Sequence, residues 1–300
     1  MSTRYLRHFR SDVFWWEPDG RVVRLSPGDG VYLMACVHPA GDGAVFWGGA
    51  QGRPRLWWSD GGPTLEALTP GSVSARYPAF DLSGRHLVYS LSTDVADTVE
   101  QIARDGTSTR APFTARAQIV VRRLSDGAEW PLTSGEVRDE RPALSPDGTE
   151  VVFVSNRGGV TRLWTVATAG GEAQPLRTGP RPYRPWWSVD GRRIYFFTLG
   201  PDRDQIHSVP ATGGVQVPFG ADDRGDTHGP YADVRGRHLL AHSTRDAGQR
   251  PHAGKWALYE FPLDGGTPVR LSPPGHARGA HVTRSRNGIM TFDVARRASS

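Results

Sequence analysis

Two arginines occupy the same place in a repeated sequence pattern. Arg141 and Arg184 each lie seven residues before the glycine of a short turn, at Gly148 and Gly191. A guanidinium group is planar, always charged, and can hold a carboxylate or phosphate through two parallel hydrogen bonds. Two such groups that face one space repel each other unless an anion lies between them. The pair therefore predicts a site for a small carboxylate-bearing anion.

The same count, applied to the other turns of the pattern, predicts what surrounds the arginines. From Gly43, Gly84, Gly236 and Gly288 it reaches four further residues: Cys36, Tyr77, Gly229 and His281. We expect ligand contacts from Arg141 and Arg184 together with Arg76, Trp186, Tyr183 and Glu140, which lie beside counted positions. Trp186 is a candidate for stacking on a ligand. The alternative is a closed network in which Asp139, Glu140 and loop carbonyls neutralise the arginines.

Histidines offer a second kind of chemistry near the same place. His228 lies one residue before the counted position of its repeat and His281 lies at it, while His38 lies two residues after Cys36. Imidazole titrates near neutral pH and binds divalent metals well. Three interpretations stay open. His228 and His281 act with Tyr77 as acid–base catalysts, or join His38 in holding a divalent metal, or are ordinary hydrogen-bonded side chains. Cys36 is interpreted as a small buried residue.

The elements that must position these residues are short strands. Glycine and proline make up 36 + 24 = 60 of the 300 residues, as expected where tight turns join many strands. Residues 141–176 read as four strands separated by turns, and the turn glycines recur from Gly43 to Gly288 at intervals of 41 to 64 residues. Such a repeat is typical of a β-propeller blade. We predict an all-β fold: a six-bladed β-propeller of four-stranded antiparallel blades.

The ends of the chain complete one blade in this interpretation. Residues 276–294 supply two strands and residues 12–30 supply the other two, so that the N- and C-terminal strands share a blade and close the ring. The single domain spans 1–300, and the other blades are expected at 31–72, 73–136, 137–180, 181–226 and 227–275. An insertion at 93–116 contains a short amphipathic helix pattern.

The repeat resembles a known family. Residues 144–176, LSPDGTEVVFVSNRGGVTRLWTVATAGGEAQPL, are similar to the TolB-type propeller repeat in the S-P-D-G turn, the F-V-S-N-R strand end and the L-W-x-V strand. Weaker copies extend over almost the entire chain. The resemblance implies the propeller fold and leaves the activity open, since such repeats occur in TolB, in peptidase propellers and in oligogalacturonate lyase.

A narrower resemblance concerns the histidines. His228 and His281 resemble the inner-strand histidines with which oligogalacturonate lyase, a propeller of seven blades, holds a divalent metal. His38 is displaced by two positions from the matching place, and the glutamine of that site has no counterpart. The resemblance implies a metal only through these histidines.

Composition and motifs exclude several classes of function. The net charge of +5 comes from arginines interspersed with acidic residues, so we expect no nucleic-acid partner. No signal-peptide pattern or long apolar run occurs and there is one cysteine, from which we expect a cytoplasmic protein without a membrane partner. No G-x-S-x-G motif occurs, so we expect no peptidase activity. Two functions remain: a module that binds a small anion or a protein in its funnel, or a lyase or isomerase that acts on a carboxylate there.

Overall fold

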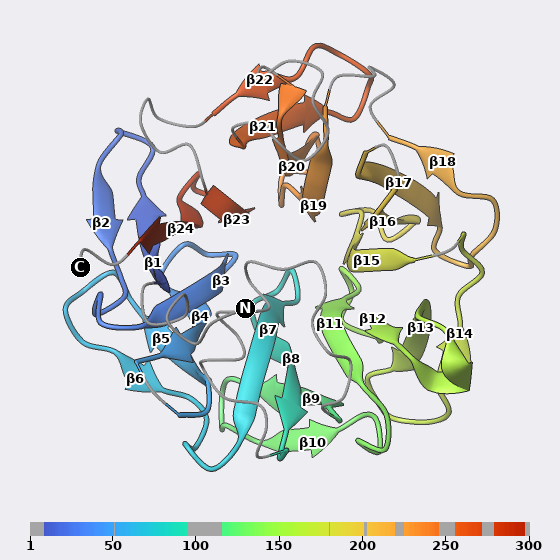
Figure 1. Ribbon diagram of the computed structural model, residues 1–300, viewed down its shortest axis with the longest axis horizontal. Coiled ribbons are helices and arrows are strands. Elements are labelled where there is room, and N and C mark those ends of the chain that lie inside the picture. The colour runs from blue at the N-terminus through green and yellow to red at the C-terminus, as the bar shows by residue number, and fades with distance from the viewer. Residues whose placement is uncertain are drawn as a thin grey trace.

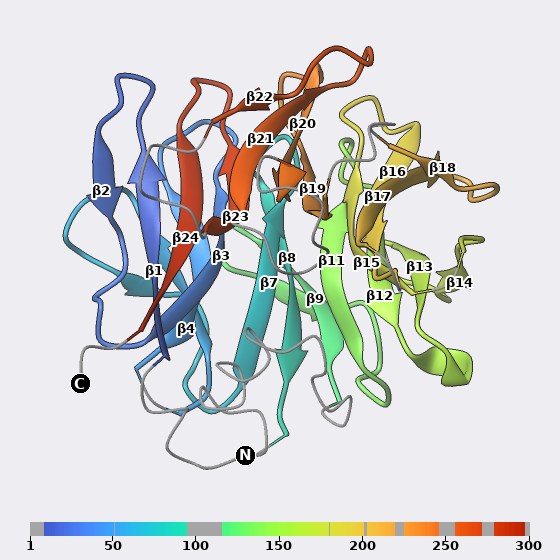
Figure 2. The same cartoon turned by 45° about the horizontal axis from the view of Figure 1, so that its top comes forward.

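The protein is an all-β propeller of antiparallel blades, arranged in a ring around a central axis (Figure 1). The computed structural model describes residues 9–50, 52–94, 116–179, 181–200, 203–219, 225–245, 256–271 and 279–297. In each four-stranded sheet the first strand lies nearest the axis and later strands lie progressively farther out (Figure 1). Figure 2 shows the inner strands running side by side along the axis.

Four sheets contain four strands each. From the axis outward they are β7 (Ser74–Phe80), β8 (His86–Ser92), β9 (Gln118–Arg123) and β10 (Glu129–Pro131); β11 (Asp139–Leu144), β12 (Glu150–Ser155), β13 (Arg162–Ala167) and β14 (Gln174–Pro175); β15 (Pro182–Trp187), β16 (Arg193–Thr198), β17 (Gln205–Pro210) and β18 (Val217–Pro218); β19 (Thr227–Ala232), β20 (His238–Ser243), β21 (Ala257–Pro262) and β22 (Val269–Arg270). A short 3₁₀ turn, η2 (Arg157–Gly159), separates β12 from β13.

The fifth sheet contains eight strands and joins the two ends of the described chain. One half consists of β23 (Gly279–Arg284), β24 (Met290–Arg297), β1 (Phe9–Trp16) and β2 (Val22–Arg24); the other consists of β3 (Val31–Val37), β4 (Ala44–Gly49), β5 (Arg55–Ser59) and β6 (Glu66–Ala67). β1 pairs with β24 in antiparallel register along its whole length. A single parallel pair, Ser11 with Val31, links the two halves.

The second strand of each sheet supplies the core. In β12, residues 151–155 are buried without interruption, because neighbouring sheets cover both faces of the strand. Among the largest fully buried side chains, Phe46, Tyr89, Phe153, Phe196 and Leu239 all lie on second strands. Burying one such side chain contributes roughly 1.5–3 kcal/mol. The packing of sheet against sheet therefore fixes the positions of the inner strands.

A turn with a left-handed glycine follows each inner strand, and the structure corrects one of the predicted turns. The amide of Gly84 donates a hydrogen bond to the carbonyl of Asp81, and Gly41 makes the equivalent bond to His38. The φ of Gly41 is 79°, which favours glycine. Gly43, used in the sequence count, is not the turn residue. Counting back seven from Gly41 gives Met34 in place of Cys36.

The inner strands share an irregularity that places the predicted site residues. Each has a β-bulge, as between Glu140 and Ala143 in β11. In five inner strands the bulge contains a residue with positive φ; these are Met34 (53°), Tyr77 (57°), Arg141 (55°), Arg184 (48°) and Gly229 (60°). Proline follows the last four of them. We call these five residues the left-handed ring.

The predicted insertion at 93–116 falls almost wholly on residues 95–115, which lie outside the described part of the chain. Among the described residues, no helix has the length and hydropathy needed to span a membrane.

Candidate functional site

A cavity lies on the axis at the level of the left-handed ring. Its lining includes the ring residues Met34, Tyr77, Arg141 and Arg184. The prolines that follow three of them, the paired rings of Trp186 and Tyr231, and Cys36 complete most of the wall. The cavity has a volume of about 40 Å³, which is room for a few water molecules or one small anion. The structure thus brings Arg141, Arg184, Tyr77 and Trp186 together in the wall of one cavity.

Neither cavity arginine forms an ion pair with a described residue. Nη1 of Arg141 is buried and has no hydrogen-bond partner among the described side chains and backbone. The guanidinium carbon of Arg141 lies 4.3 Å from the centre of the Tyr77 ring, a cation–π contact that takes none of the N–H donors. Burial, together with the charge of Arg141, lowers the pKa of Arg184 to about 10, against the opposing influence of Tyr231, Tyr77 and Asp293. Positive charge in the cavity is thus incompletely compensated.

The acidic residues expected to neutralise these arginines are paired with other arginines. An oxygen of Glu140 lies 2.6 Å from Nη2 of Arg138, and an oxygen of Asp139 lies 2.6 Å from Nη2 of Arg157. Burial opposes ionisation of Glu140, but Arg138, Arg141 and Arg76 hold its pKa below the ordinary value. The predicted ligand residue Glu140 therefore belongs to a structural ion pair. The closed network exists, and it leaves Arg141 and Arg184 without an ion-pair partner among the described residues.

The other predicted ligand residues differ in their access to the cavity. Trp186 is partly buried and packs edge-on against Tyr231, with ring centres 5.1 Å apart. Tyr183 is stacked on Phe197 at 5.8 Å and does not line the cavity. Arg76 lies over the Trp47 ring at 5.7 Å and is also absent from the lining.

Cys36 is buried in the cavity wall, as expected for a small core residue. Burial raises the pKa of its thiol to about 12, so the thiol stays protonated at neutral pH.

His228 points toward the preceding sheet. Its Nε2 contacts an oxygen of Asp204, which is 2% exposed. Its ring lies between those of Phe197 and Trp256, with centres 4.8 and 4.3 Å away. These partners hold the imidazole in one orientation.

His281 forms a buried pair with Asp293, the residue on β24 that the sequence analysis did not consider. Nδ1 of His281 lies 3.0 Å from Oδ1 of Asp293. Nε2 of His281 is buried without a hydrogen-bond partner among the described residues. Burial and the charges of Arg184, Arg141 and His228 hold the pKa of His281 well below its ordinary value. Burial also raises the pKa of Asp293 to about 7, which His242 and Arg184 oppose.

The three histidines predicted as metal ligands do not come together. Nδ1 of His38 lies 2.5 Å from Asp42, and its Nε2 lies 3.0 Å from the carbonyl of Gly84, at the turn end of its inner strand. His228 is held by Asp204 near the start of its own strand. No group of described residues that includes His38, His228 or His281 brings three ligand atoms within 4.8 Å of one another. The residues present therefore do not fit the predicted divalent metal.

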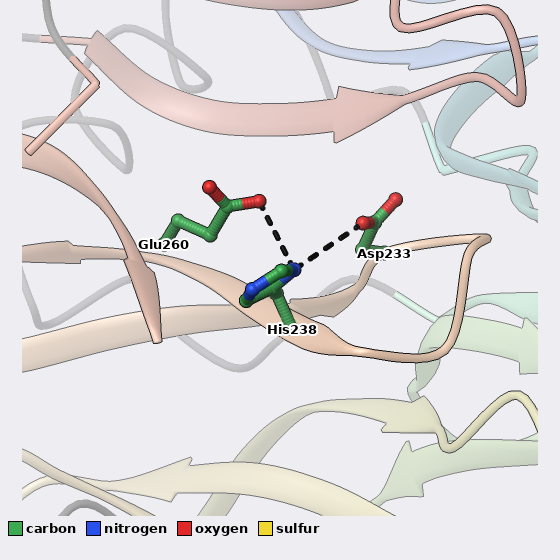
Figure 3. A group of neighbouring side chains, drawn as sticks. All are labelled: Asp233, His238 and Glu260. Carbon is green, nitrogen blue, oxygen red and sulfur yellow. Dashed lines mark ion pairs between the residues drawn. The ribbon is translucent and has the colours of Figure 1, made fainter. Parts of the chain in front are cut away.

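Another group of potential ligand atoms lies at the turn end of β19 and β20. Asp233, His238 and Glu260 bring such atoms within 4.8 Å of one another, with Nδ1 of His238 at 3.2 Å from Glu260 and 3.8 Å from Asp233 (Figure 3). Nη1 of Arg284 contacts the same oxygen of Glu260 and lies 3.6 Å from the same oxygen of Asp233. A guanidinium thus supplies the positive charge that a metal ion would bring, and we interpret the group as a contact between sheets.

Sequence reasoning did not assign His242, Asp293 or Tyr231 to the site. His242 is 3% exposed and directly opposite His228 in the β19–β20 pair. His242 and Asp293 both stand fifth in the apolar second-strand segments HLLAHS and IMTFDV. An ionisable residue at the same point of two largely apolar segments was the signal that could have found His242 and Asp293.

Comparisons with solved structures agree with the propeller architecture. The "putative TolB" of Agrobacterium tumefaciens superposes with a TM-score of 0.71 at 16% identity, covering 97% of this chain and 99% of that one. TolB from Acinetobacter baumannii gives 0.60 at 14% identity over 96% and 64% of the two chains. An oligogalacturonate lyase in complex with manganese gives 0.62 at 12% identity over 97% and 84%. The protein therefore has the fold of the TolB-like propellers.

In the sequence comparisons, about half of this chain matches a smaller part of each of two longer proteins. The uncharacterized peptidase YuxL of Bacillus subtilis is 31% identical over 163 residues, which are 47% of this chain and 24% of that protein. Tricorn protease homolog 1 of Streptomyces coelicolor is 29% identical over 169 residues, which are 53% and 14% of the two chains. No protein-family model matches the chain.

Proposed function

We propose that the axial cavity binds a small carboxylate-bearing anion between Arg141 and Arg184. The observation that carries the proposal is that both guanidinium groups line the cavity and neither has an ion-pair partner among the described residues, while Glu140 and Asp139 are paired elsewhere. An anion between the two groups would accept hydrogen bonds from both and remove their mutual repulsion. Tyr77 and Trp186 would form the sides of the site.

The test is a titration with acetate and propanoate, followed by calorimetry. We expect Arg141→Ala and Arg184→Ala each to weaken binding at least tenfold, because each removes a charge-assisted contact. Arg162→Ala, at an exposed position of β13, is the matched control and leaves the affinity unchanged. Equal affinities in all four proteins would place the anion elsewhere and overturn the proposal.

We infer that the ring has six blades. The support is that the eight-stranded sheet divides into two sets of four antiparallel strands, and among the described residues Ser11–Val31 is the one strand pairing between the two sets. With the four separate sheets, this makes six sets in the order that the repeat predicts. Electron density at a resolution that separates the two sets would test the count.

A second candidate is a lyase or isomerase that removes a proton from the carbon next to the carboxylate. The contact between His281 and Asp293 favours it, since a histidine oriented by a carboxylate is a common general base. Among proteins of this fold, one is named an oligogalacturonate lyase and another a gluconolactonase. Loss of the α-deuterium from 2-deuterated propanoate or lactate, followed by NMR, would support this candidate if His281→Gln abolishes it. Retention of the label in the unaltered protein would reject it for these compounds.

A further inference from the structure

Gly229 is the member of the left-handed ring that has no side chain. At the equivalent places, Met34, Tyr77, Arg141 and Arg184 project side chains that line the cavity. These residues have φ values of 48–57°, against 60° for Gly229. The backbone of the ring therefore accepts L-residues, and the glycine at 229 is not explained by its torsion angle alone. Its effect is to leave space beside β19.

Polar groups from two different sheets border that space. A β-carbon at Gly229 would lie 3.6 Å from Nη1 of Arg184 on β15 and 3.9 Å from Nδ1 of His242 on β20. The ring of Tyr231 would lie 3.5 Å away. A single small atom at this point would thus be close to a guanidinium nitrogen and an imidazole nitrogen at once.

The imidazole of His242 lacks hydrogen-bond partners. It is 3% exposed, and neither Nδ1 nor Nε2 has a partner among the described residues. Burial, with the neighbouring charges of His281, Arg184 and His228, lowers its pKa to about 3, so the ring is neutral at physiological pH. Leaving a buried donor or acceptor without a hydrogen bond destabilises the folded protein. A polar atom beside Gly229 would satisfy one of these two nitrogens.

We propose that the space beside Gly229 is a hydroxyl subsite of the anion cavity, and that the ligand is a small 2-hydroxycarboxylate. This rests on the proposed anion site. Arg184 borders both places, so the hydroxyl belongs on the carbon next to the carboxylate. The hydroxyl oxygen accepts a hydrogen bond from Nη1 of Arg184, and its hydrogen is donated to Nδ1 of His242, which is neutral. A second carboxylate at this subsite would face one guanidinium and an uncharged imidazole. Its negative charge would be less well neutralised than the charge of the first carboxylate, which lies between two guanidinium groups.

The experiment compares propanoate, lactate (2-hydroxypropanoate, both enantiomers) and 3-hydroxypropanoate by calorimetry at one pH and salt concentration. We expect one lactate enantiomer to bind the unaltered protein at least tenfold more tightly than propanoate, and 3-hydroxypropanoate to bind no more tightly than propanoate. In Gly229→Ala the methyl group fills the subsite, and the lactate advantage falls below twofold while propanoate keeps its affinity within threefold. His242→Leu produces the same loss of advantage without changing the backbone.

Gly236→Ala is the matched control for backbone strain. Gly236 also has positive φ (71°), and a β-carbon there would meet only the Val189 side chain at 3.5 Å. We expect the lactate advantage to persist in this variant. Lactate and propanoate binding equally well to the unaltered protein would overturn the subsite and leave the anion site standing. Absence of binding by any of these anions would overturn both, and an advantage that survives both Gly229→Ala and His242→Leu would overturn the assigned place.

Discussion

His242 is a buried polar residue whose ring nitrogens have no hydrogen-bond partner among the described residues. It lies in the core of its sheet, beside Arg184, His281 and Asp293, and contributes neither a salt bridge nor a hydrogen bond among the described residues. Natural cores seldom keep such a group without a reason. Its retention is explained if a ligand provides the missing contact.

The burial of His242 predicts an acid-sensitive fold. Its pKa falls from 6.5 when unfolded to about 3 when folded, so below pH 6.5 the unfolded chain gains a proton that the folded protein does not. Stability contributed by the neutral ring is thus lost as the pH falls. Between pH 7 and pH 5 the unfolding free energy lost through His242 amounts to about 2 kcal/mol.

We expect His242→Leu to lose about 2 kcal/mol less of its unfolding free energy than the unaltered protein over that interval, as measured by urea denaturation at each pH. The quantity to compare is the slope of unfolding free energy against pH in each protein, because Asp293 and His281 titrate in both. Parallel pH profiles for the two proteins would contradict the assignment.

At the scale of the strand, the bulges determine where the arginines point. Tyr77, Arg141 and Arg184 have left-handed backbones, which cost roughly 1–2 kcal/mol for an L-residue. The surrounding packing must hold them there. Trp187 of β15 contributes, because its Nε1 donates a hydrogen bond of 3.1 Å to the carbonyl of Ala143, two residues after Arg141.

Trp187→Phe should therefore destabilise the fold by about 0.5–1.5 kcal/mol beyond the effect of the smaller ring, since it removes the hydrogen bond to the carbonyl of Ala143. It should also weaken propanoate binding, because the bulges that carry Arg141 and Arg184 are no longer tied together. Thermal unfolding and calorimetry measure the two effects. Trp47→Phe is the control: Trp47 is equally buried, and its Nε1 has no hydrogen-bond partner among the described residues. A similar loss in both variants would show that ring volume, and not the hydrogen bond, is responsible.

The repeat in the sequence located the strands and four of the five residues of the left-handed ring, because a left-handed turn favours glycine and glycine is easily recognised. It misplaced the first member of the ring, since Gly41 and Gly43 lie two residues apart and only backbone torsion distinguishes them. Residues before proline favour the extended region, so the pairs Tyr77–Pro78 and Arg141–Pro142 gave no sign of the left-handed backbone found at Tyr77 and Arg141. Pairing across sheets, as between His228 and Asp204, has no local signal in the sequence.

At the scale of the molecule, β1 connects the two ends of the described chain. It pairs with β24 along its whole length, and Phe14 stacks on Phe292 with ring centres 5.4 Å apart. Val13 and Trp15 are buried against β3 and β4 of the other half of the sheet. The pattern of strand segments predicted this arrangement, because residues 13–26 resemble third and fourth strands that lack a first and second.

Removing residues 1–24 should open the ring. The truncation takes out β1 and β2, exposes the paired edge of β24 and removes Val13 and Trp15 from the core, at a cost of roughly 3–6 kcal/mol in buried apolar surface. We expect a lower unfolding temperature and self-association, measured by calorimetry and size-exclusion chromatography. Removal of residues 1–8, which ends before β1, is the control. An unfolding temperature unchanged by the longer truncation would contradict the role of β1.

The left-handed ring also bears on how such a protein could change its ligand. At each of its five positions the direction of the side chain follows from the backbone bulge, and the types found there, Met34, Tyr77, Arg141, Arg184 and Gly229, share no chemistry. Substitution at any of these five positions would alter the charge and shape of the cavity. The strands, turns and core that hold the cavity would remain unchanged. A library restricted to these five codons would sample ligand preferences on a constant scaffold.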